Sequence, residues 1–321
     1  MFLETRILFI YVETPLHAGA GSGVEAIDLP IQRERTTGFP MVQAPGIKGA
    51  LRSEVRHAEK GAKNEALLRP VFGADAGDDN LHAGAFSPGD ARLLLFPVRS
   101  LMGVFAWTTC LEVLQRWQRE VLAAGFTKLP KLPAAQPGKD ECYAAGDDAL
   151  ADGVAVLEEF AFTKTDDPDV TKLAAWLALN ALPAGPEFDW WREGLKKRLI
   201  ILSNDDFRDF TLHATEVLTR IRLVPDTKTV QQGALWTEEH LPPESLLYAP
   251  TRATRLRVNK DDKPDALKGD DTAEGEAAAV LDWVSDADNI PHRFQIGGDE
   301  TVGRGLVSLR WLKAGDVQEV K

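Results

Sequence analysis

The chain has 321 residues, of which 44% are hydrophobic and 27% charged, as is ordinary for a globular protein of one large domain or two. Two cysteines are too few for a disulfide framework or a cysteine-based zinc site, and no apolar run is long enough to cross a bilayer. The acidic, strand-like start does not resemble a signal peptide. We therefore expect a cytoplasmic protein without membrane contact.

The net charge of −12 argues against nucleic-acid binding, but the distribution of the acids weakens that objection. Residues 139–169 and residues 261–290 each hold ten acids and two lysines, which gives −8 for each stretch. Taking both stretches away from −12 leaves +4 for the rest of the chain. The presumed core is thus mildly basic, although acidic loops that only keep a protein soluble would look the same.

In chain order, the hydrophobic pattern of the first half predicts two strands and two helices. They are a strand at 5–12, a helix from 46 to about 60, a strand at 92–98 and a helix at 107–124. Glycine, proline and aspartate are frequent between these elements, so we predict long loops at 61–89 and 126–150.

The second half shows further strands and helices and one hairpin. The hairpin is predicted over 216–224 and 229–235, around the turn Pro225-Asp226-Thr227-Lys228. The other predicted elements are a helix at 171–182, strands at 199–203, 246–248, 253–258, 293–296 and 306–312, a turn or helix at 205–210 and a helix at 277–284.

This order of elements fits an α+β fold, a ferredoxin-like βαββαβ core with long insertions in one domain over 1–321. Residues 61–89 and 126–190 are the expected insertions, and 259–275 is expected to be an acidic loop. Residues 216–240 are expected to form the protruding hairpin.

The run from residue 16 to residue 35 is the most informative part of the chain. Its alternating glycines allow φ > 0 and close approach of a ligand backbone, and its arginines suit phosphate because a guanidinium is planar and always charged. The histidine and the aspartate are titratable, although the commonest role of a loop aspartate is to form a turn. These residues are His17, Gly19, Gly21, Gly23, Asp28, Arg33 and Arg35.

The helix that opens at Gly46 combines free backbone N–H groups with a basic side. Its N-terminus and dipole favour an anion, and Lys48 and Arg52 lie one turn apart beside it. A solvated basic face is the alternative interpretation, and the residues alone favour it.

A second glycine-rich loop lies between the two last predicted strands, at 296–305. Glycines and an arginine suit close approach of a phosphodiester backbone, but the acids Asp299 and Glu300 do not, and an ordinary glycine-rich hairpin is the alternative. The candidate contacts are Gly297, Gly298, Gly303, Arg304 and Gly305.

The runs TPLHAGAGSGVEAIDLPIQRE at 14–34 and TGFPMVQAPGIKGALR at 37–52 resemble the RAMP superfamily of CRISPR proteins. Further matches are DARLLLFPVRSLMGVFAW at 90–107 and IGGDETVGRGLVSLRW at 296–311. Within that superfamily the chain is similar to the repeated backbone subunit of the Cmr-type (type III-B) RNA-targeting effector complex.

The resemblance implies a modified RNA-recognition-like core with a β-hairpin thumb and a helical lid. It implies that guide RNA phosphate binds the helix at Gly46, that copies of the chain stack along the guide with other Cmr-type subunits, and that single-stranded target RNA is cut. Asp28 would be required for that cleavage, with a divalent metal such as Mg²⁺ as cofactor.

The hairpin supplies the remaining candidates. The resemblance implies that the thumb enters the guide–target duplex, with Trp236 as a possible wedge and Arg220 and Arg222 lining the duplex. Glu238 is a weak candidate for a second metal ligand, but a solvated pair of Glu238 and Glu239 is slightly favoured.

Two alternatives remain open. One is an RNA-binding scaffold that cuts nothing. The other is a metal-independent RAMP endoribonuclease that processes guide precursors through a histidine-centred site. No partner histidine at a suggestive spacing accompanies His17, so we expect this residue to contact RNA rather than to act as the base.

Overall fold

The first predicted strand lies well inside a large mixed sheet. The computed structural model describes residues 2–23, 26–57, 61–75, 77, 81–259 and 262–320, without the side chains of 61–65. In it, β1 (Glu4–Val12) is flanked by the antiparallel strands β12 (Leu246–Ala253) and β14 (Leu306–Leu312). Most of β1 is buried, as its continuous apolar run predicts.

The sheet continues on both sides of these three strands, in the order β13-β14-β1-β12-β4-β5-β9-β6-β8-β7. Pairing is antiparallel except between β5 and β9 and between β6 and β8. The remaining strands are β13 (Arg293–Gln295), β4 (Ala91–Arg99), β5 (Phe105–Cys110), β9 (Leu199–Leu202), β6 (Glu141–Ala144), β8 (Phe160–Thr165) and β7 (Val154–Leu157), with β2 (Met41–Val42) on β4 and β3 (Phe86–Pro88) on β12.

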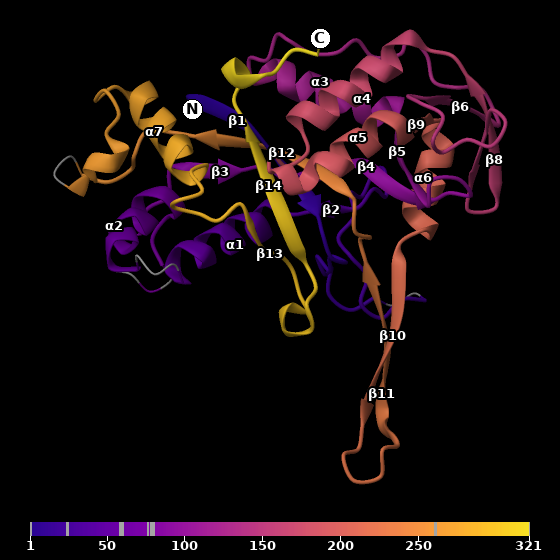
Figure 1. Cartoon of the computed structure of the whole chain (residues 1–321). Coiled ribbons are helices and arrows are strands. Elements are labelled where there is room, and N and C mark those ends of the chain that lie inside the picture. The colour runs from indigo at the N-terminus through magenta and orange to yellow at the C-terminus, as the bar shows by residue number, and fades with distance from the viewer. Residues whose placement is uncertain are drawn as a thin grey trace.

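Helices cover the sheet in groups. Figure 1 shows α3, α4 and α5 together along one side, and α1, α2 and α7 at the end of the molecule away from β8. Trp117 of α3 and Trp176 of α4 lie edge to face with ring centroids 5.1 Å apart. The helices are α1 (Ala44–His57), α2 (Gly61–Phe72), α3 (Leu111–Ala123), α4 (Pro168–Asn180), α5 (Asp189–Arg198), α6 (Asn204–His213) and α7 (Ala273–Val284), with 3-10 turns η1 (Pro186–Phe188), η3 (Asp265–Leu267), η4 (Glu300–Val302) and η5 (Ala314–Asp316).

The predicted hairpin stands apart from the main sheet. Strands β10 (Glu216–Leu223) and β11 (Val230–His240) form a two-stranded sheet of their own and project from the body (Figure 1). Their outer parts are exposed, whereas the last three residues of β11 are buried in the body. The hairpin prediction is therefore confirmed, and β11 reaches five residues beyond the predicted end at 235.

The α+β class and most predicted elements are confirmed, but several assignments are wrong. Residues 61–72 form α2 rather than a loop, because Leu67, Leu68 and Val71 give the segment a buried face. Residues 107–110 end β5 instead of beginning a helix, because they pair in parallel with β9. The predicted loop at 126–150 contains β6, and one strand, β12, replaces the two predicted at 246–258.

Some predictions fall partly outside the described residues. These are the end of the first helix near residue 60 and part of the acidic loop at 259–275. In the part of the chain that the structure describes, no helix is long and apolar enough to span a membrane.

Candidate functional site

The predicted site residues meet where the base of the hairpin joins the loop at 14–33 and the glycine-rich loop at 296–305. Residues 26–31 run beside β11: the Leu29 N–H donates to the Thr237 carbonyl at 3.0 Å, and the Glu239 N–H donates to the Leu29 carbonyl at 3.0 Å. This pairing aligns the loop with the strand, so the position of the Asp28 carboxylate is set by β11.

Asp28 is exposed and its carboxylate is held by one residue of β11. Oδ2 accepts hydrogen bonds from the Thr237 N–H at 2.8 Å and from the Thr237 hydroxyl at 2.9 Å. The Asp28 N–H in turn donates to that hydroxyl oxygen at 3.0 Å. The backbone bond first, and the hydroxyl bond second, keep the pKa of Asp28 below its ordinary value. Asp28 is therefore an exposed, ionised carboxylate whose Oδ1 accepts no hydrogen bond from a described residue.

The Glu239 side chain also holds the loop that carries Asp28 in place. Its buried carboxylate accepts from the Ile31 N–H at 3.0 Å, from the Thr215 hydroxyl at 2.8 Å and from Arg33. Arg33 also donates from Nη1 to two backbone carbonyls, at 2.8 and 2.9 Å. Arg33 therefore has partners within the protein, and its predicted RNA contact stays a prediction.

Glu238 is also buried, so the prediction of a solvated acidic pair is wrong. Burial disfavours ionisation of Glu238, but hydrogen bonds from Trp236 Nε1 at 2.7 Å and Arg220 Nε at 2.8 Å outweigh it, and the pKa lies below its ordinary value. Trp236 and Arg220 thus have a partner, Glu238, within the hairpin. Arg222, on the same strand as Arg220, is exposed.

His17 has a neighbouring histidine that the spacing in the sequence conceals. The ring centroids of His17 and His240 lie 5.4 Å apart. His17 Nδ1 lies 2.7 Å from the Glu239 carbonyl oxygen, which can only accept, so in neutral His17 the proton is on Nδ1 and Nε2 is an acceptor. Burial lowers the pKa of His240 against the opposing hydrogen bond to Asp299. His17 therefore has a neighbouring histidine in the fold, although no histidine lies at a suggestive spacing in the sequence.

One group of side chains could share a cation. Ligand atoms of Glu238, His240 and Asp299 lie within 4.8 Å of one another. Arg220 already supplies positive charge there, with Nη2 3.7 Å from Asp299 Oδ2. Asp28 does not belong to this group of described residues.

The glycine-rich loop packs against the loop that carries His17. The Gly298 N–H donates to the His17 carbonyl and the Gly305 N–H to the Pro15 carbonyl, both at 2.9 Å. A Cβ on Gly297 would lie 2.4 Å from the His17 carbonyl oxygen, so only glycine fits. These three glycines serve close packing, and Gly303 and Arg304 are the part of the loop open to a ligand.

Gly19 lies close to another side chain, whereas Gly21 faces open space. A Cβ on Gly19 would lie 2.8 Å from His17 Nε2, whereas no atom lies within 4 Å of a Cβ on Gly21. Gly19 therefore keeps the space around the imidazole open, and Gly21 needs glycine for its φ of +94° alone.

The N-terminus of α1 is less available to an anion than its sequence suggests. Asp90 accepts from the Ala44 N–H at 2.8 Å, and the Gly46 N–H donates to the Gln43 carbonyl at 2.9 Å. The predicted anion site built from free N–H groups at Gly46 is therefore wrong in that detail. Gly46 does line a groove of about 450 Å³ between α1 and the glycine-rich loop.

Lys48 and Arg52 have different surroundings. Arg52 donates to the Gly73 carbonyl at 3.1 Å and to Asp75 at 2.9 Å. Lys48 is half-buried and forms no ion pair with a described residue; burial first, and the nearby charges of Arg52 and Arg257 second, lower its pKa. Lys48 is therefore a basic side chain of α1 that has no acidic partner among the described residues.

Comparisons with known proteins agree with this arrangement. The RAMP superfamily matches residues 9–308. A curated relative, "CRISPR system Cmr endoribonuclease Cmr4" of Pyrococcus furiosus, is 34% identical over 312 residues, 96% of this chain and 95% of its own length. "CRISPR system CMR subunit Cmr4" of Saccharolobus solfataricus is 28% identical and covers 95% of both chains.

Solved structures show the same fold. The structure of oligomeric Cmr4 from Pyrococcus furiosus superposes with a TM-score of 0.72 at 28% identity, over 97% of this chain and 99% of that one. A chain of the type III-B Cmr-beta complex bound to cognate target RNA gives a TM-score of 0.70 at 23% identity, over 99% of both chains, which supports the fold alone.

Proposed function

Because this chain belongs to the RAMP superfamily, we propose that it is a repeated backbone subunit of a type III-B CRISPR effector complex that binds guide RNA and cuts the complementary target RNA. One observation carries the proposal: an exposed carboxylate, Asp28, is fixed at the base of a protruding hairpin in a chain 34% identical to a Cmr endoribonuclease. We place the complex in the cytoplasm.

The lowered pKa of Asp28 bears on its chemical role. A general base works best when its pKa is near the working pH, so a carboxylate held below its ordinary pKa is a poor base. The same ionised oxygen is a hard ligand of the kind that Mg²⁺ prefers. We therefore assign Asp28 to holding a divalent cation, with Thr237 orienting the carboxylate.

RNA supplies its own nucleophile, so the protein has little covalent chemistry to perform. Cleavage needs the 2′-hydroxyl aligned in line with the scissile phosphate and the developing charge offset. When bound, a divalent cation would offset that charge and lower the pKa of the attacking hydroxyl. His17 Nε2 could accept a proton, and Lys48, Arg222 and Arg304 are the cations that we assign to phosphate.

The protruding hairpin has a mechanical part in this proposal. Its outer strands expose Ile221 and Leu235, which face each other across the hairpin. Inserted between stacked bases, such side chains unstack the strand and kink it. An unstacked nucleotide would let its 2′-hydroxyl reach the in-line position near Asp28.

The test is Asp28→Asn in the assembled complex. The variant keeps the shape of the side chain but loses its charge, so we expect target cleavage to be abolished while guide binding and assembly stay intact. Asp271→Asn, a change of the same kind at the α7 end, is the matched control and should cut normally. Cleavage by Asp28→Asn at the wild-type rate would overturn the assignment.

The pair of histidines keeps a second function in view. His17 and His240 lie close together, as the base and the acid of a metal-independent guide-processing ribonuclease would, but the His240 side chain is fully buried and its Nε2 faces Asp299, which disfavours this function. Cleavage in EDTA separates the two functions, because the Asp28 site would stop and a histidine site would continue. A complex that cuts no RNA under either condition would be a scaffold only.

A further inference from the structure

A pocket outside the candidate site lies where the turn between β7 and β8 meets α6. Its volume is about 550 Å³, within the range of roughly 300–1,000 Å³ that small-molecule sites occupy. Figure 1 shows β8 and α6 next to each other above the hairpin. The described residues that line the pocket include none of the predicted site residues, so the proposed function leaves this pocket without a role.

Two walls of the pocket carry the same kinds of side chain. On the turn, two glutamates are followed by Phe160, and on α6, Asp206 and Asp209 are followed by Phe210. Residues three and four apart lie on one face of a helix, which explains why all three α6 side chains line the pocket. The rings of Phe160 and Phe210 meet edge to face, with centroids 5.9 Å apart. The pocket therefore has carboxylates on both sides of an aromatic centre.

Phe160 differs from the other aromatic residues of the pocket in its exposure. It is 55% exposed, whereas Phe162 and Phe210 are buried. The face of an aromatic ring attracts cations, because its quadrupole places negative charge there. An exposed ring beside carboxylates thus offers a cation two kinds of attraction at once. Among the described residues, no lysine or arginine lines the pocket to compete for them.

Each wall has one carboxylate without a cation. Glu158 on the turn and Asp209 on α6 each pair with an exposed arginine. Glu159 and Asp206 form no ion pair with a described residue, although Asp206 accepts a hydrogen bond from the Ser203 hydroxyl at 2.5 Å. Glu159 and Asp206 are therefore the acids that a cationic ligand could reach first.

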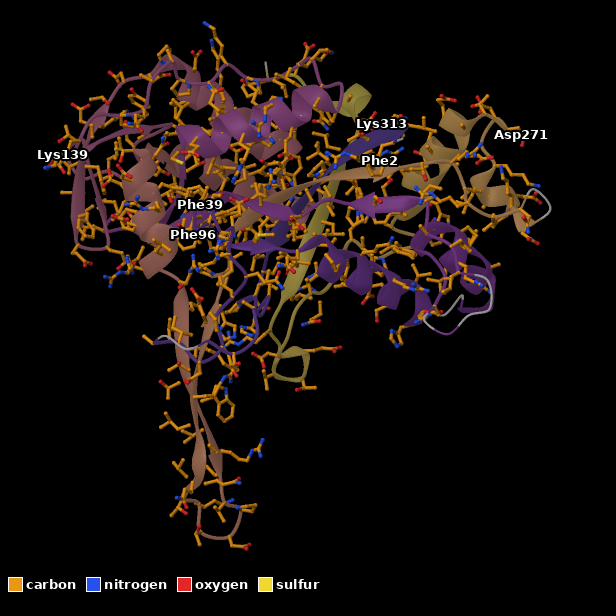
Figure 2. The ribbon with its side chains drawn as sticks, turned by 180° about the vertical axis from the view of Figure 1, so that it is seen from behind. Phe2, Phe39, Phe96, Lys139, Asp271 and Lys313 are labelled. Atoms are coloured by element: carbon orange, nitrogen blue, oxygen red, sulfur yellow. The ribbon has the colours of Figure 1, made fainter. Side chains whose placement is uncertain are left out.

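The wall on the turn belongs to the acidic stretch at 139–169. Figure 2 marks the two acidic stretches of the chain by Lys139 and Asp271, at opposite ends of the molecule. In the stretch near Asp271, acids such as Glu276 and Asp282 have basic partners within the chain. Glu159 in the first stretch has no such partner among the described residues, which leaves it available to a ligand.

We propose that this pocket binds an aliphatic polyamine. Its ammonium groups pair with Glu159 on one wall and Asp206 on the other, and its methylene chain lies against the phenylalanine rings. A ligand with one ammonium group pairs with one wall only, whereas a polyamine pairs with both. An anion such as a phosphate would be repelled. The proposal is independent of the proposed function, because no step of RNA cleavage uses these residues.

The test is isothermal titration calorimetry of the full chain without RNA, with spermidine and with butylamine. RNA is left out because its phosphates also bind polyamines, and about 0.15 M salt limits the effect of distant charges. Spermidine should bind about tenfold more tightly than butylamine, because a second ammonium group gains a carboxylate and an aromatic face. Butylamine also represents a lysine side chain of a protein partner, so equal affinity for the two amines would overturn the proposal.

Variants locate the binding site. Glu159→Gln and Asp206→Asn each remove the free carboxylate of one wall, so each should lower spermidine affinity about tenfold, to that of butylamine. Phe160→Ala keeps every charge but removes an aromatic face, and should lower spermidine affinity about two- to fivefold. Asp166→Asn changes an exposed acid of the same stretch, beyond the other end of β8, and is the matched control that should bind like the wild type.

Two results would overturn the proposal. One is a wild-type protein that does not bind spermidine. The other is equal binding by the wild type, Glu159→Gln and Phe160→Ala, because spermidine would then follow the net charge of the protein and not this pocket. Should Asp206→Asn disturb the start of α6, as judged by circular dichroism, the comparison of Glu159→Gln and Phe160→Ala with Asp166→Asn still decides the outcome.

Discussion

Glu239→Ala should destabilise the fold and disable the candidate site together. The wild-type carboxylate is buried and accepts hydrogen bonds from Ile31, Thr215 and Arg33. Removing it leaves the Ile31 N–H without an acceptor, which costs about 1–3 kcal/mol. It also breaks an ion pair that is largely buried, a change that costs about 3–5 kcal/mol when both partners are fully enclosed.

In this protein, breaking the ion pair between Arg33 and Glu239 should cost less than breaking a fully enclosed pair. The Arg33 side chain keeps 20% of its surface exposed and retains its bonds to two carbonyls, so its charge is not fully stranded. We therefore expect a total loss of about 3–4 kcal/mol, measured by urea unfolding. At about 2–4 °C for each kcal/mol in a large domain, Tm should fall by roughly 6–16 °C.

A matched control isolates the effect on the site. Glu276 of α7 is buried in the same way and accepts from the Leu256 N–H at 3.0 Å and from Lys263. Glu276→Ala should lose similar stability but keep target cleavage at a temperature where both variants are folded. Glu239→Ala should cut poorly there, because the loop that carries Asp28 has lost its anchor at Ile31. Equal cleavage by the two variants would refute this reasoning.

Three further predictions follow from single residues. Burial raises the pKa of Glu244 from 4.5 to about 7, so the contribution of its protonated form to stability is present below pH 4.5 and is lost as pH rises through 7. At pH 8, Glu244→Gln should be up to about 3 kcal/mol more stable than the wild type, and equal stability of the two proteins there would contradict the raised pKa. Lys48→Ala should lower the slope of log guide affinity against log salt by about 0.7, and an unchanged slope would place this lysine away from RNA. Arg52→Ala should mainly lower Tm, because Arg52 pairs with Asp75. Val104→Gly should raise stability by about 1 kcal/mol in thermal unfolding, because glycine accepts the φ of +74° without strain. A lower Tm would show that the valine side chain stabilises the turn by packing.

The fold could be predicted where local pattern and final environment agree. The run Ile7–Val12 of β1 is apolar because the strand is buried on both faces, and the hairpin has a proline-aspartate turn between two strand-like runs. Prediction failed at α5, whose exposed face is so charged that its short buried face gives little periodicity. It failed at 107–110 because a short apolar run before a helix has no feature that distinguishes it from the helix itself.

The site could be predicted only in part for a related reason. His17 and Asp28 stand out in one loop, but burial of Glu238 and Glu239 depends on that loop lying across β11, which the residues around them do not reveal. The pairing of His17 with His240 joins positions 223 residues apart. The run Glu238-Glu239-His240 at the end of β11 was the feature of the sequence that pointed to the site. Its role becomes clear only from the contact between β11 and the loop that carries Asp28.

The position of β1 has a consequence for how the protein is made. β1 pairs with residues 246–253 and 306–312, so it leaves the ribosome long before either of its two neighbours. Contacts between such distant parts of a chain close slowly. Until residues 246–253 are synthesised, the apolar run Ile7–Val12 therefore has two unpaired edges, which is the form of chain that aggregates and that chaperones bind. A chain cut short before residue 306 would keep one of those edges open permanently.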